Sequence, residues 1–178
     1  MLHADPPATL FPLLMPRRLQ RLATIAAATV IATTLHAQAP VEKVHVVITG
    51  GKHAGTYDAV GTRAGCSANA TGAGSFGNQL SSTKGDPKAF NSLQLIIPNA
   101  KAAAAGTAEF QMIIGFGPIM QRTGELEVNT IATEKKKTGS GNVKLKDSGK
   151  TADIEINATT ASGDKIVATI SCLSVLRM

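Results

Sequence analysis

Histidine and aspartate side chains are the first candidates for chemistry in this chain, and the histidines are sparse after residue 37. That part of the sequence holds only two histidines, His45 and His53, and Asp58 lies five residues beyond the second. A histidine held beside a carboxylate and a serine could serve as the base of a small hydrolase. Because no nucleophile-elbow sequence accompanies these residues, we expect both histidines to face solvent, and we assign no catalytic residue.

The sequence also lacks the usual residue patterns for binding a metal or a cofactor. Two histidines and two cysteines, with no CxxC spacing, do not supply the clustered ligands that zinc needs. The run Gly50-Gly51-Lys52-His53 follows a predicted strand and precedes another, whereas a phosphate-binding loop leads into a helix. We therefore predict a hairpin turn at this run and expect neither a metal nor a cofactor.

The two cysteines, Cys66 and Cys172, predict a structural disulfide. In an oxidising compartment, a cysteine pair in a small domain is usually a disulfide. The bond would close a loop of roughly 100 residues, which is worth about 4–5 kcal/mol in the chain-entropy treatment. A redox pair or a pair of metal ligands are the alternatives, but neither the spacing nor a nearby histidine supports them.

The segment 17–39 predicts that the chain is exported. Three arginines between residues 17 and 21 precede an uncharged apolar run at 22–35, and small residues follow at 37 and 39. The run is shorter than the ~20 apolar residues of a membrane span, so the pattern indicates a cleavable signal peptide. We predict translation from Met15, cleavage after Ala37, no transmembrane segment afterwards, and a periplasmic or extracellular location.

Residues 38–178 are numerous enough for a single exported domain with one core. Loss of residues 1–37 removes three arginines and one aspartate, which lowers the formal net charge from +6 to +4. The one basic run, at 134–137, is predicted to be a solvated hairpin tip. Because the chain has few aromatic residues and no wide basic face, we expect no nucleic-acid partner. We expect the partner to be a protein or a small molecule of unknown identity.

Alternating apolar and polar residues predict β-strands along most of residues 38–178. The clearest pair lies at 152–158 and 166–172, and it is joined by a turn at 161–164. Similar stripes lie at 44–48, 56–62, 93–97, 110–116, 126–130 and 143–145. About eight short strands with almost no helix predict an antiparallel β-sandwich, with a closed β-barrel as the alternative.

Two connections interrupt the strand pattern. Asn99 precedes the alanine-rich segment 100–105, which ends at Gly106, so we predict one short, capped helical connector. Residues 65–82 are rich in glycine, serine and asparagine, and they predict a long surface loop. Tyr57 and Phe76 are the aromatic residues that could flank a binding site beside this loop.

The most apolar stretch after residue 37 is 112–120. Met112, Ile114, Phe116 and Met120 share one face of a strand pattern, so they are candidates to line a pocket for a small apolar ligand. The other interpretation is a central strand that is buried on both faces and ends at 117–118.

The C-terminal strand, turn and strand that ends in Cys172 resembles the end of several secreted bacterial β-sandwich domains, including mycobacterial lipoprotein antigens. The likeness spans roughly the last 30 residues and lies in pattern rather than identity. It implies the fold and carries no function. Because catalytic, metal and cofactor motifs are absent, we expect a non-catalytic exported module that binds or presents a surface. A carrier of a small apolar ligand is the second hypothesis, and a small hydrolase is the third.

Overall fold

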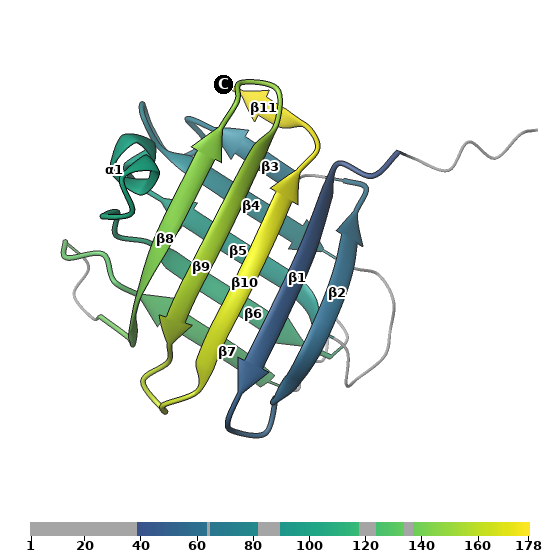
Figure 1. Cartoon of the computed structure of the whole chain (residues 1–178), viewed down its shortest axis with the longest axis vertical. Coiled ribbons are helices and arrows are strands. Elements are labelled where there is room, and N and C mark those ends of the chain that lie inside the picture. The colour runs from purple at the N-terminus through teal and green to yellow at the C-terminus, as the bar shows by residue number, and fades with distance from the viewer. Residues whose placement is uncertain (1–38, 64, 82–89, 118–123, 134–136) are drawn as a thin grey trace, which may run out of the picture. The chain divides into compact units, whose positions relative to one another are not determined.

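The computed structural model describes residues 39–63, 65–81, 90–117, 124–133 and 137–178. The predicted signal peptide, at residues 1–37, lies outside the described residues, and so does most of the basic run at 134–137. The described residues form two β-sheets and one short helix (Figure 1).

The first sheet, sheet A, has five antiparallel strands in the order β2-β1-β10-β9-β8. Its strands are β1 (Glu42–Thr49), β2 (Gly55–Gly61), β8 (Ser140–Asp147), β9 (Ala152–Thr159) and β10 (Lys165–Cys172).

The second sheet, sheet B, has six strands in the order β11-β3-β4-β5-β6-β7. Neighbouring strands are antiparallel except for β11, which runs parallel to β3. Its strands are β3 (Gly65–Ala68), β4 (Phe76–Ser81), β5 (Phe90–Ile97), β6 (Gln111–Phe116), β7 (Gly124–Asn129) and β11 (Val175–Arg177).

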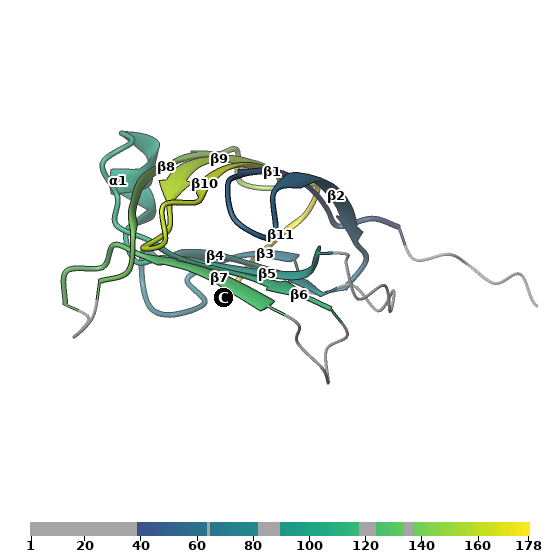
Figure 2. The ribbon, with the colours of Figure 1, turned by 90° about the horizontal axis from the view of Figure 1, so that it is seen from below.

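The two sheets pack face to face, as the edge-on view shows (Figure 2). Strict alternation puts every second residue of β1, β9 and β10 in the core, because successive side chains of a strand point to opposite faces. The buried residues of both sheets form one hydrophobic cluster. The predicted β-sandwich is thus confirmed, and the alternative of a single closed sheet is wrong for the described residues.

The described residues form eleven strands rather than about eight, and the difference lies partly in the predicted loop at 65–82. The prediction of a loop there is wrong, because this segment contains β3 and β4. Its small residues fit the sheet closely: a Cβ at Gly77 would lie 3.1 Å from the carbonyl oxygen of Leu95. Strand pairing with β5 and the disulfide at Cys66 offset the low strand propensity of glycine and serine.

The helix α1 (Ala100–Ala104) is the predicted connector, one residue shorter than expected. The Asn99 side chain caps it by accepting a hydrogen bond of 2.9 Å from the backbone N–H of Ala102. Gly106 follows with φ of +73°, the left-handed conformation that ends many helices. The helix packs beside β8, at one edge of sheet A (Figure 1).

Candidate binding surface

The outward-facing side of sheet A carries two rows of mostly polar residues that cross all five strands. We call this side the outer face of sheet A. Strand register aligns the first row as Asp58, His45, Thr169, Glu155 and Lys144. The second row is Val60, Lys43, Ser171, Asp153 and Lys146. Each strand therefore contributes one column, and acidic, hydroxyl and basic columns lie side by side.

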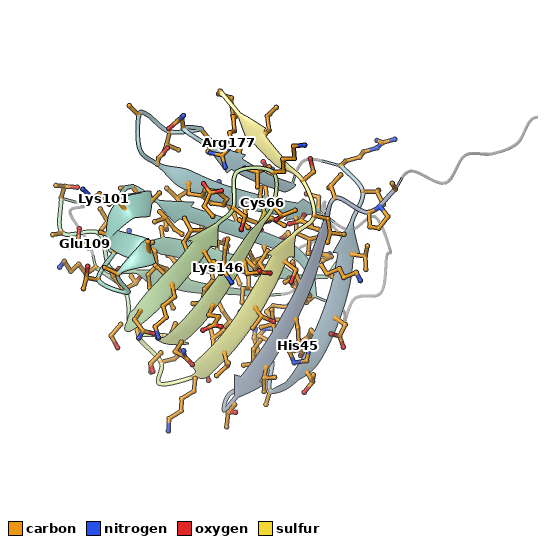
Figure 3. All side chains as sticks on the ribbon, turned by 45° about the horizontal axis from the view of Figure 1, so that its top comes forward. His45, Cys66, Lys101, Glu109, Lys146 and Arg177 are labelled. Carbon is orange, nitrogen blue, oxygen red and sulfur yellow. A yellow bond between two sulfur atoms is a disulfide. The ribbon has the colours of Figure 1, made fainter. Side chains whose placement is uncertain are left out.

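Two open grooves lie along these rows and share their central residues. One, of about 510 Å³, crosses β8, β9 and β10. The other, of about 300 Å³, crosses β1, β2 and β10. Thr169 and Ser171 line both grooves, so the hydroxyl column forms a common floor. Figure 3 labels His45, which belongs to the column of β1, and Lys146, which belongs to the column of β8.

The end of α1 closes one side of the larger groove. Ala104 lines the groove together with residues of β8. A Cβ at Gly106 would lie 3.5 Å from Cγ and Cε of Lys144, an ordinary van der Waals distance, so the chain after the helix runs beside the aliphatic part of that side chain. Lys144 is exposed, so its aliphatic part lies beside the chain while its ammonium group stays in solvent.

Asp58 pairs with His45 rather than with His53. The His45 Nδ1 atom lies 2.7 Å from Oδ1 of Asp58, directly across the β1–β2 pairing. The two side chains are 47% and 78% exposed, so water surrounds the pair. The hydrolase hypothesis combined His53 with Asp58, and the structure does not bring those two side chains together. His45 faces solvent as expected.

His53 differs from the expectation that it faces solvent, because it is partly buried between the two sheets. Its ring stacks on Phe116 of β6, with centroids 3.9 Å apart and an interplanar angle of 12°. The Tyr57 hydroxyl donates a hydrogen bond of 2.9 Å to the His53 carbonyl oxygen. Burial lowers the pKa of His53, and the positive charge of Lys52 lowers that pKa further. The negative charge of Asp164 opposes this shift, but burial is the largest cause, so the folded protein disfavours the charged form of His53.

Three of the four residues predicted to line an apolar pocket belong to the hydrophobic core. Met112, Ile114 and Phe116 lie on β6 and are almost completely buried within the hydrophobic cluster. Met120 lies outside the described residues. The grooves on sheet A are lined by other residues.

Tyr57 and Phe76 do not meet. Tyr57 contacts Phe90, at the start of β5, with ring centroids 6.2 Å apart. Phe76 pairs with Ile97, at the other end of β5, and is buried. Seven residues separate Phe90 from Ile97 along the strand, a distance of roughly 23 Å at ~3.3 Å per residue. The two aromatic residues therefore lie at opposite ends of the sandwich.

Cys66 of β3 and Cys172 of β10 form the predicted disulfide, with their Cα atoms 5.8 Å apart. The bond joins sheet B to sheet A. The chain crosses between the same sheets just after Cys172, because β11 begins at Val175, which pairs with Cys66. The covalent link and the chain crossing thus lie at one end of the molecule.

Sequence reasoning missed the two polar rows and the buried residue Glu42. The alternation in β8, β9 and β10 already placed the exposed residues on one face, but the order of the strands in the sheet was unknown. Glu42 has the same parity as Val44 and Val46, which is a signal that its side chain points into the core.

No helix in the described ranges is both long enough and apolar enough to cross a membrane. Comparisons with protein-family models, with curated proteins and with solved structures find no match. The fold and the site define the class by themselves: a two-layer β-sandwich with an interlayer disulfide and a polar, grooved outer face.

Proposed function

We propose that this protein is a non-catalytic, exported β-sandwich that binds a polar partner through the outer face of sheet A. The observation that carries the proposal is the pair of adjoining grooves over the hydroxyl column of Thr169 and Ser171. Acidic residues flank this column on β9, and Lys43 and His45 flank it on β1. A partner with both charges, such as an extended polypeptide segment, matches this arrangement.

Three observations support binding rather than transport or catalysis. The core residues of β6 are packed against their neighbours, which leaves them poor candidates for a ligand cavity. The His45–Asp58 pair is widely exposed, whereas catalytic groups work best where water is excluded. The surface mixes charges of both signs instead of forming the basic face that nucleic acids prefer.

Export is supported by the leader pattern at 17–39 and by the disulfide.

Fluorescence anisotropy with a labelled peptide of alternating lysine and glutamate tests the proposal. Thr169→Arg places a long side chain in the groove floor, so we expect it to weaken binding at least tenfold. Gln94→Arg is the matched control, because Gln94 is exposed on β5 in the opposite sheet. Added salt should also weaken binding by the wild type, since exposed charges are screened.

Two parallel measurements separate the proposal from the other hypotheses. Binding of dodecanoate with no binding of the peptide would favour the carrier of an apolar ligand. Hydrolysis of p-nitrophenyl acetate that disappears in His45→Gln would favour a hydrolase. Equal peptide binding by the two arginine variants would contradict the assignment of the outer face of sheet A.

A further inference from the structure

Glu42 is an acidic residue that lies wholly inside the sandwich. Its side chain has no exposed surface, and it points from β1 into the space between the sheets. Asn78 of β4, also buried, faces it from sheet B and donates a hydrogen bond from Nδ2 to Glu42 Oε2. The same Nδ2 lies 3.5 Å from Sγ of Cys66. A carboxyl–amide contact thus lies beside the interlayer disulfide.

No charged group among the described residues faces the Glu42 carboxyl from the elements packed against it. Gly61 of β2 and Cys172 of β10 are its strand partners, and a Cβ at Gly61 would lie 2.4 Å from Oε1. From sheet B, a Cβ at Gly65 would lie 3.9 Å from its carboxyl carbon. Asn78 lies against the carboxyl from sheet B, and its Nδ2 also contacts Sγ of Cys66. Only burial and the hydrogen bond from Asn78 shift the pKa of Glu42, so an ionised Glu42 would have no described cation to balance it.

Two buried oxygen atoms of this contact have no hydrogen-bond partner in the part of the chain that the structure describes: Oε1 of Glu42 and Oδ1 of Asn78. Both are acceptors when the carboxyl group is ionised, so neither satisfies the other. One proton on Oε1 turns that atom into a donor, and Oδ1 of Asn78 is then the matching acceptor. A single proton therefore removes two buried unsatisfied groups, each of which is otherwise costly.

We propose that Glu42 is protonated in the folded protein, that it forms a carboxylic acid–amide pair with Asn78, and that loss of this proton weakens the join between the two sheets. The pair is a pH-sensitive clasp across the sandwich core. The proposal is independent of the binding function assigned to the outer face of sheet A, because the residues lie on the opposite side of β1 from His45 and Lys43.

The direction of the titration agrees with this arrangement. Burial raises the pKa of Glu42 from 4.5 to about 7, and the hydrogen bond from Asn78 lowers it by a smaller amount. Between these two pKa values the folded state holds a proton that the unfolded state has released. The contribution of Glu42 to stability is therefore fully present below pH 4.5 and is lost as the pH rises through about 7.

Unfolding of the protein in urea, measured across this pH range, tests the clasp. The unfolding equilibrium constant of the wild type should rise by up to about tenfold per pH unit through this window, relative to Glu42→Gln. Glutamine keeps the shape and gives the same pairing without a titrating proton. Glu155→Gln, an exposed residue of β9, is the matched control and should keep the wild-type pH dependence.

A second measurement needs no variant. In wild-type protein labelled with ¹³C at the glutamate carboxyl carbons, one glutamate signal should titrate at a pH of about 7. If every glutamate is ionised at pH 6 and Glu42→Gln has the wild-type pH dependence, the clasp does not exist. The labelling experiment alone decides the question if the glutamine variant does not fold.

Discussion

Burial acts on two titratable residues at opposite ends of β1, and it moves their pKa values in opposite directions. Glu42 begins the strand, and burial raises its pKa. His53 lies in the turn after the strand, and burial lowers its pKa. In both cases the folded protein favours the neutral form. The two residues therefore oppose each other in the pH dependence of stability, and single substitutions separate their effects.

His53 should make the protein less stable in acid. Because its pKa is lowered from 6.5 in the folded state, the unfolded chain binds a proton first as the pH falls. Its contribution is complete above pH 6.5 and is lost as the pH drops through the folded-state pKa. We expect His53→Gln to remove this acid-side loss in urea unfolding at pH 5 to 7, measured against the wild type.

His45→Gln is the matched control for His53→Gln, because His45 is the exposed histidine of the neighbouring strand. It should retain the loss of stability in acid. An identical pH dependence for the wild type and the His53 variant would show that the stacked ring on Phe116 stays accessible to protons.

At the scale of elements, the strands of sheet A were predictable, and β3 and β4 of sheet B were not. Strict alternation in 152–158 and 166–172 identified β9 and β10, because one face of each strand is buried and the other is exposed to solvent. In β3 and β4, glycine, serine and asparagine replace that pattern. β4 is held by pairing with β5, and β3 is held by pairing with β4 and by the disulfide. Local composition does not reveal the pairing with β5 or the disulfide, because both are long-range interactions.

The candidate surface was less predictable than the strands that build it. Alternation identified Asp153 and Glu155 as exposed, but their row neighbours come from β8 and β10, and the order of strands in a sheet is not a local property. The helix connector was the opposite case. Its cap at Asn99 and its stop at Gly106 are local signals, so the segment was predicted almost to the residue.

The close approach of β8 to the end of β9 depends on Gly139. Its φ is +76°, and an added Cβ would lie 2.3 Å from the carbonyl oxygen of Thr159. Gly163 also has a positive φ, +93°, but an added Cβ there would meet nothing within 4 Å. We expect Gly139→Ala to lower the free energy of unfolding by at least about 2 kcal/mol more than Gly163→Ala.

Urea unfolding of the two alanine variants gives this difference directly. The conformational strain of a positive φ is common to both positions, so the difference isolates the contact with the β9 backbone. Equal losses would mean that the start of β8 moves away from Thr159 at little cost.

At the scale of the whole molecule, the disulfide links the two sheets and closes a loop that contains most of the chain. Cys66 and Cys172 are separated by 106 residues. We expect Cys66→Ala combined with Cys172→Ala to lower the free energy of unfolding by about 4–5 kcal/mol, because the unfolded chain regains the entropy of that loop. Urea unfolding under oxidising conditions measures the loss.

Reduction of the wild type provides the control for the double alanine variant. The reduced protein should unfold at a urea concentration near that of the variant. If neither change lowers stability by more than about 1 kcal/mol, packing between the sheets holds the sandwich without the covalent link.

The most direct test of the account is an NMR titration that locates the bound peptide of alternating lysine and glutamate on the protein. The account predicts chemical-shift changes centred on Lys43, Glu155, Thr169 and Ser171, with little change at Gln94 on the opposite sheet. Changes centred on Met112 and Ile114 with dodecanoate, and none on sheet A with the peptide, would contradict it and place the ligand in the core.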